Sequence, residues 1–82
     1  MNKIIVQYQP FIMDQKVTVL DDNNKPISNY NIHLDQIPDL IAALSKREVD
    51  EIALLGSKTY IAQQKNEIAE KVNNVNIKII SI

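Results

Sequence analysis

Residues 49–61, with the sequence VDEIALLGSKTYI, decide how the second half of the chain folds. The apolar run Ile52–Leu55 is typical of a short buried strand, Gly56 of a tight turn, and the residues after it of the start of an amphipathic helix. Because a strand that leads into a helix usually returns to a parallel neighbour, these residues predict a β-α-β unit with a right-handed crossover.

The chain before this stretch has the pattern of three consecutive strands. We predict them at Lys3–Gln9, Lys16–Leu20 and Ile27–Leu34, joined by turns at Pro10 and at residues 21–26, where Asp and Asn can bond their own backbone. The adjacent apolar residues of the first strand indicate a central strand that is covered on both faces. Polar and apolar residues alternate in the third strand, which indicates a half-exposed strand at an edge.

Two helices and a last strand complete the pattern. The first helix can be capped by Asp35, and its apolar stripe follows the spacing i, i+3, i+4, i+7 at Ile37, Leu40, Ile41 and Leu44. The second starts near Ser57 or Thr59 and ends at Asn73-Asn74. Its thinner stripe, which Gln64 and Lys65 interrupt, consists of Ile61, Ile68, Ala69 and Val72. Glu67 and Lys71 are spaced to pair on its wet side, and a strand at 75–82 ends the chain.

The predicted fold is a single α/β domain over residues 1–82, with a mixed five-stranded sheet and two helices in the order βββαβαβ. This order resembles that of the ribonuclease H-like fold, which implies the sheet order 3-2-1-4-5. Nucleases of that fold hold two metal ions on carboxylates in the first and fourth strands. Here those places are occupied by Ile5, Val6, Gln7, Leu54 and Leu55, so a metal nuclease is not expected. With one glycine, the chain also lacks the phosphate-binding hairpins of the related ATPases.

The sequences of two segments, Tyr8-Gln9-Pro10-Phe11 and residues 52–60, resemble sequences of small uncharacterised proteins from phages that infect Gram-positive bacteria. This resemblance implies no activity. It would place the chain in the host cytoplasm.

Composition excludes several function classes. The 82 residues include no cysteine, which rules out disulfides, thiolate zinc sites and a cysteine nucleophile. The net charge is −1 and the basic residues are scattered, so nucleic-acid binding is not expected. No apolar run approaches the length of a membrane span, and the start is too short in apolar residues for a signal peptide. We therefore expect a cytoplasmic domain without a cofactor.

A ligand site is conceivable at Gly56, Ser57, Lys58 and Thr59, where a strand ends and a helix begins. Free amide groups and the helix dipole favour anions there, so a small anion- or nucleotide-binding module is one prediction. The alternative is that Gly56 adopts a positive φ angle and Ser57 or Thr59 caps the helix. His33 has no second ligand partner and is predicted to be solvated, and Asp21-Asp22 is explained by turn chemistry.

The preferred prediction is a non-catalytic interaction protein with an unidentified protein partner. Phe11, Ile12 and Met13 follow Pro10 at a strand connection and predict an exposed apolar contact, unless they fold under the sheet as a lid. The last strand, with Ile77 and Ile79, has one charge and no proline. If it lies at an edge, it is poorly protected and predicts a homodimer. We expect no catalytic residues and no metal site.

Overall fold

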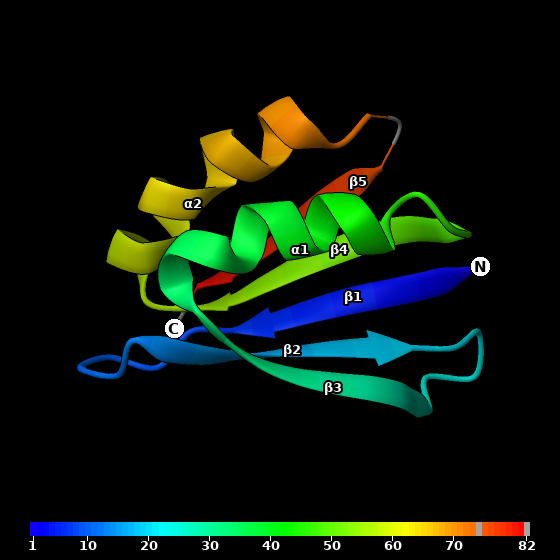
Figure 1. Cartoon of the computed structure of the whole chain (residues 1–82), viewed down its shortest axis with the longest axis horizontal. Helices are drawn as coiled ribbons and strands as arrows, with labels where there is room; N and C mark the ends of the chain where they lie inside the picture. The colour runs from blue at the N-terminus through cyan, green and yellow to red at the C-terminus, as the bar shows by residue number, and fades with distance from the viewer. Residues whose placement is uncertain (74, 82) are drawn as a thin grey trace.

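A computed structural model describes residues 1–73 and 75–81 of the chain. Its elements follow the predicted order, with a short 3-10 helix η1 before the first helix: β1 (Asn2–Gln7), β2 (Asp14–Leu20), β3 (Pro26–His33), η1 (Leu34–Gln36), α1 (Ile37–Leu44), β4 (Val49–Gly56), α2 (Lys58–Lys71) and β5 (Asn76–Ser81). The five strands form one sheet in the order β3-β2-β1-β4-β5 (Figure 1). The pairs β1–β2 and β2–β3 are antiparallel, whereas β1–β4 and β4–β5 are parallel. The predicted mixed α/β fold is confirmed.

Both helices lie on the same face of the sheet (Figure 1). The connections from β3 to β4 and from β4 to β5 proceed in the same direction across the sheet, so crossovers of the same hand place their helices on the same side. The prediction that β1 is covered on both faces is therefore wrong. Ile4 and Val6 are fully buried under the helices, but Ile5 points to the other face and stays half-buried.

The core lies between the sheet and the two helices. Ile4 is paired with Val19 of β2 and with Ile52 of β4, and Val6 is paired in the same way with Val17 and Leu54. Each buried side chain of this kind contributes about 2 kcal/mol. The helices close the core with Ile37, Ile41, Ile61 and Ile68.

The apolar stripe predicted for α1 is confirmed, but the stripe of α2 differs from the prediction. Gln64 is buried in α2 together with its apolar neighbours, and Ala69 is exposed. The buried positions are separated by three or four residues, and Gln64 occupies one of them because its amide is hydrogen bonded inside the protein.

The helix ends also correct two predictions. Asp35 does not cap α1: the N-cap residue is Gln36, whose side chain makes no capping hydrogen bond, while Pro38 lies in the first turn. Lys71 does not bond Glu67 but reaches Asp39 of α1, at 2.6 Å between Nζ and Oδ1. This ion pair joins the two helices and raises the pKa of Lys71. The predicted ends at Asn74 and Ile82 lie outside the described residues.

Within the described ranges, neither α1 nor α2 has the length and apolar character that crossing a membrane would require.

Candidate functional site

Gly56 ends β4 against the backbone of Tyr8. Its φ is 145°, so the predicted positive φ is confirmed. A Cβ atom at this position would lie 2.7 Å from the carbonyl oxygen of Tyr8 and 2.9 Å from its Cβ, which no side chain tolerates without a backbone shift. Ser57 occupies the N-cap position of α2, but its side chain makes no capping hydrogen bond. The close approach of the Tyr8 backbone therefore explains why residue 56 is a glycine, and a bound ligand is not needed to account for it.

The Tyr8 side chain fills the space at this end of the sheet. Its hydroxyl donates to Oε1 of Gln64 at 2.9 Å, and Nε2 of Gln64 donates to the carbonyl of Leu34 at 2.8 Å. The ring stacks on Tyr60, with 6.3 Å between centroids. Burial raises the pKa of the Tyr8 hydroxyl far above its ordinary value, so the group stays protonated and donates. Tyr8 and Gln64 thus satisfy each other's polar groups beside the carboxyl end of β1.

A second buried amide, that of Gln15, holds the loop between β1 and β2. Gln15 is 1% exposed. Its Oε1 accepts from the backbone N–H of Gln9 at 2.6 Å, and its Nε2 donates to the carbonyl of Gln9 at 3.1 Å and to the carbonyl of Ile12. The N–H of Phe11 donates to the hydroxyl of Tyr60 at 3.4 Å. Residues 9–13 are therefore fixed by side chains from β2 and α2.

This arrangement places the three apolar side chains of the loop in solvent. Phe11 is 99% exposed and has a φ of 65°, and Ile12 and Met13 are 48% and 53% exposed. The alternative in which they form a lid under the sheet is wrong, because the backbone of the loop faces the Gln15 amide and its side chains face outward. We call Phe11, Ile12 and Met13 the contact loop.

The other predicted interface residues lie on a separate surface. Ile77 of β5 packs partly against the core, whereas Ile79 is 41% exposed. Ile80, which the sequence prediction did not include, is also 41% exposed. β5 forms the sheet edge beyond β4, so the structure does not bring these residues together with the contact loop.

The remaining predicted positions have local roles. Nδ1 of His33 accepts the backbone N–H of Asp35 at 3.1 Å, so His33 caps η1 instead of being only solvated. Oδ1 of Asp21 accepts the N–H groups of Asn23 and Lys25, which confirms the predicted turn. Among residues 1–73 and 75–81, no three His, Asp or Glu side chains gather in a way that could hold a metal ion.

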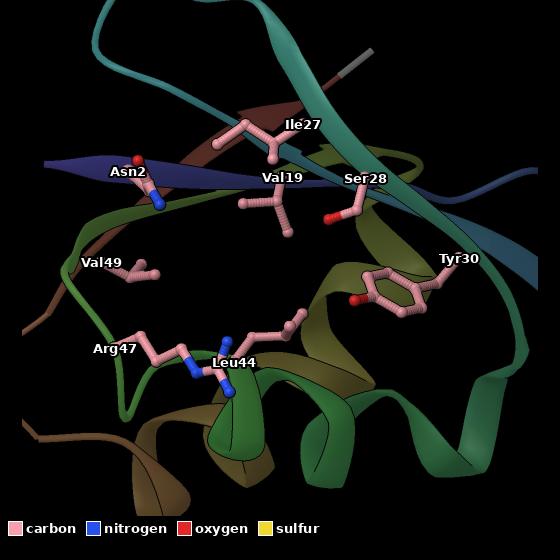
Figure 2. Close-up of a pocket in the computed structure, with 8 residues that line it drawn as sticks. All are labelled: Asn2, Val19, Ile27, Ser28, Tyr30, Leu44, Arg47 and Val49. Carbon is pink, nitrogen blue, oxygen red and sulfur yellow. The ribbon is translucent and has the colours of Figure 1, made fainter.

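The opposite end of the molecule contains a hollow of about 160 Å³ between the strands and the end of α1. Figure 2 shows the hydroxyl groups of Ser28 and Tyr30 directed toward it from β3, with Leu44 and Arg47 on the other side. A more open hollow of about 370 Å³ lies beside the edge strand β3. Neither hollow is lined by residues 56–59.

Comparison of the sequence with protein families and with curated proteins finds no match. The site therefore has to be interpreted from its own residues. Sequence reasoning missed Gln15 and the role of Gln64. Each glutamine stands at a position where the strand or helix period predicts a buried apolar side chain, and this departure from the pattern could have indicated a buried, hydrogen-bonded amide.

Proposed function

We propose that the chain is a non-catalytic interaction protein that binds a protein partner through the contact loop. The observation that carries this proposal is the pairing of full exposure at Phe11 with the hydrogen bonds that Gln15 and Tyr60 make to the loop backbone. An ordered loop with exposed apolar side chains is what a protein contact requires.

The physical chemistry favours binding. Burying an exposed phenylalanine in a partner contributes roughly 1.5–3 kcal/mol, and aromatic anchors commonly dominate interface energies. Because the loop is already ordered by Gln15, association loses less conformational entropy than it would with a flexible loop. Ile12 and Met13 extend the apolar surface, and the methionine can adapt to an irregular partner surface.

The test is affinity capture from the cells that make the protein, with three matched baits. Phe11→Ser removes the anchor, and Ile27→Ser removes an exposed isoleucine at the other end of the sheet, which is 55% exposed. A partner retained by the wild type and by Ile27→Ser, but lost with Phe11→Ser, supports the proposal. Equal capture by all three folded baits counts against it.

We propose three further properties of the chain. We propose that the fold is a reduced ribonuclease H-like fold, for which the element order and strand order are the support. The second is a phage origin, which is supported by the sequence resemblance of two short segments, residues 8–11 and 52–60. The third is binding of a small anion or nucleotide at Gly56, Ser57, Lys58 and Thr59. It has weaker support, because closeness to Tyr8 already accounts for Gly56.

The anion proposal has a direct test. The unused Ser57 hydroxyl and the exposed Lys58 and Thr59 side chains are the groups that would bind the anion. Inorganic phosphate and nucleoside triphosphates should then raise the melting temperature of the wild type and leave a Ser57→Ala, Lys58→Ala variant unchanged. No shift of the wild type across this panel would end the idea.

A further inference from the structure

The two edges of the sheet differ in their protection. β3 begins at Pro26, which has no backbone N–H to donate, and its register with β2 shifts between Val19 and Leu20, whereas β5 pairs with β4 without a shift. β5 contains no proline, and Lys78 is its single charged residue within 76–81. Unprotected edge strands of this kind present free backbone groups to another strand. β5 is therefore the edge that is open to pairing.

β5 carries one exposed isoleucine on each face of the sheet. Ile79 is paired with Leu54 and shares the helix-covered face, whereas Ile80 is paired with Leu55 on the opposite face. Each is 41% exposed. A strand added at this edge would cover Ile79 on one face and Ile80 on the other, so each face would gain an apolar contact.

We propose that β5 pairs antiparallel with β5 of a second copy about a two-fold axis. The two sheets then form one continuous sheet with twice the five strands of a single chain. A two-fold interface needs a self-complementary surface, and a strand with one exposed isoleucine on each face and a single lysine meets this requirement. The proposal concerns a surface separate from the contact loop and does not depend on the proposed function.

The sequence of β5 selects one register. In an antiparallel pair, opposite residues share a face, so the two-fold axis must pass through a residue position. An axis at Lys78 would set two lysines opposite each other, which is destabilising. An axis at Ile79 aligns residues 77–81 of both strands, with Ile79 opposite Ile79 and Lys78 opposite Ile80. Axes at Ile77 or Ile80 would align fewer residues of the strand.

The absence of cysteine makes the register measurable, because a single introduced thiol can bond only its copy. Directly opposite residues have Cα atoms about 4.5–5.5 Å apart, within the range of a disulfide. Residue 80 and its copy would be diagonal, at about 7–8 Å, outside that range. Ile79→Cys and Ile80→Cys are matched variants, since both replace an isoleucine of equal exposure.

The experiment is mild air oxidation of both variants, followed by non-reducing electrophoresis, with light scattering coupled to gel filtration on the wild type. We expect a wild-type dimer, cross-linking of Ile79→Cys and little or no cross-linking of Ile80→Cys, because only the first pair lies within the Cα separation of a disulfide. Ile79→Lys should raise the dimer dissociation constant roughly 100-fold, and Ile80→Lys serves as a second disrupting variant if the first does not fold. A wild-type monomer at all concentrations overturns the proposal. So does a dimer that Ile79→Cys does not trap, or equal cross-linking at both positions.

Discussion

The two ends of the sheet in this protein use polar side chains in opposite ways. At the carboxyl ends of the parallel strands, the buried side chains of Tyr8, Gln15 and Gln64 bond one another or the backbone. At the amino ends, Ser28 and Tyr30 face a hollow and have no hydrogen-bond partner within the described part of the chain. Open α/β sheets usually bind ligands at the carboxyl ends. Here Gln15 and Tyr60, at that end, make hydrogen bonds to the backbone of the contact loop.

The largest expected effect comes from adding a side chain at Gly56, where the end of β4 lies against the backbone of Tyr8. Gly56→Ala would place a methyl group 2.7 Å from the Tyr8 carbonyl oxygen at a φ of 145°. We expect the free energy of unfolding to fall by about 3 kcal/mol, as the sum of backbone strain and overpacking. Urea unfolding measures it. Ser57→Ala is the control and should change stability by less than about 0.5 kcal/mol, because its hydroxyl makes no capping hydrogen bond. Equal stability of both variants would contradict the packing described for Gly56.

Gln15→Leu should have the next largest effect. The substitution removes the hydrogen bonds that the Gln15 side chain makes to two carbonyls and one N–H of the loop. We expect the free energy of unfolding to fall by about 2 kcal/mol. Hydrogen exchange at residues 9–13 should accelerate in parallel, because the loop loses its bonds to β2. The control is Gln63→Leu, which changes an exposed glutamine of α2 and should cost less than about 0.5 kcal/mol. A loop that exchanges equally fast in the wild type and in Gln15→Leu would show that Gln15 does not hold it.

Tyr8→Phe removes the hydroxyl that donates a hydrogen bond to Gln64, so we expect the free energy of unfolding to fall by about 1 kcal/mol. Tyr30→Phe, at the opposite end, removes a hydroxyl that has no partner in the described residues and should be near neutral. If both changes cost the same, the contrast between the two ends is wrong.

The pH dependence gives a second readout at Tyr8. Burial raises its pKa above the ordinary value of 10.0, so above pH 10 the unfolded chain releases this proton while the folded protein keeps it. Stability contributed by the protonated hydroxyl is thus complete below pH 10 and is lost as the pH rises further. Unfolding curves between pH 9 and roughly pH 11 should show this loss in the wild type and a smaller loss in Tyr8→Phe. Identical pH dependence of the two proteins would exclude Tyr8 as its source.

The smallest expected effect is a gain. Oγ of Ser45, at the C-cap of α1, is buried without a hydrogen-bond partner among the described residues. Ser45→Ala should therefore raise the free energy of unfolding by about 0.5 kcal/mol, because it removes an unsatisfied hydroxyl. A loss of stability in a thermal melt would mean that the hydroxyl has a partner in solution.

The sequence predicts the fold well because the signals for strand and helix order are local. The period of apolar residues and the single glycine are sufficient for the element order, whereas the strand order, with the last strand at an edge, is implied by the fold resemblance. The coverage of β1 is predicted wrongly, because its adjacent isoleucines do not reveal that both helices lie on one face. The hydrogen bond between Tyr8 and Gln64 joins residues 56 positions apart, and no periodic pattern contains such a contact. The order of the contact loop depends on Gln15 and Tyr60 and is visible only after folding.

The most direct test of the account is the quantitative comparison of partner capture by the wild type, Phe11→Ser and Ile27→Ser. All three must first give the same unfolding curve, which is expected because Phe11 and Ile27 are exposed. The account predicts that one or more proteins bound by the wild type and by Ile27→Ser are absent with Phe11→Ser. Capture that is unchanged by Phe11→Ser, or lost with Ile27→Ser instead, would contradict the claim that the contact loop is the binding surface.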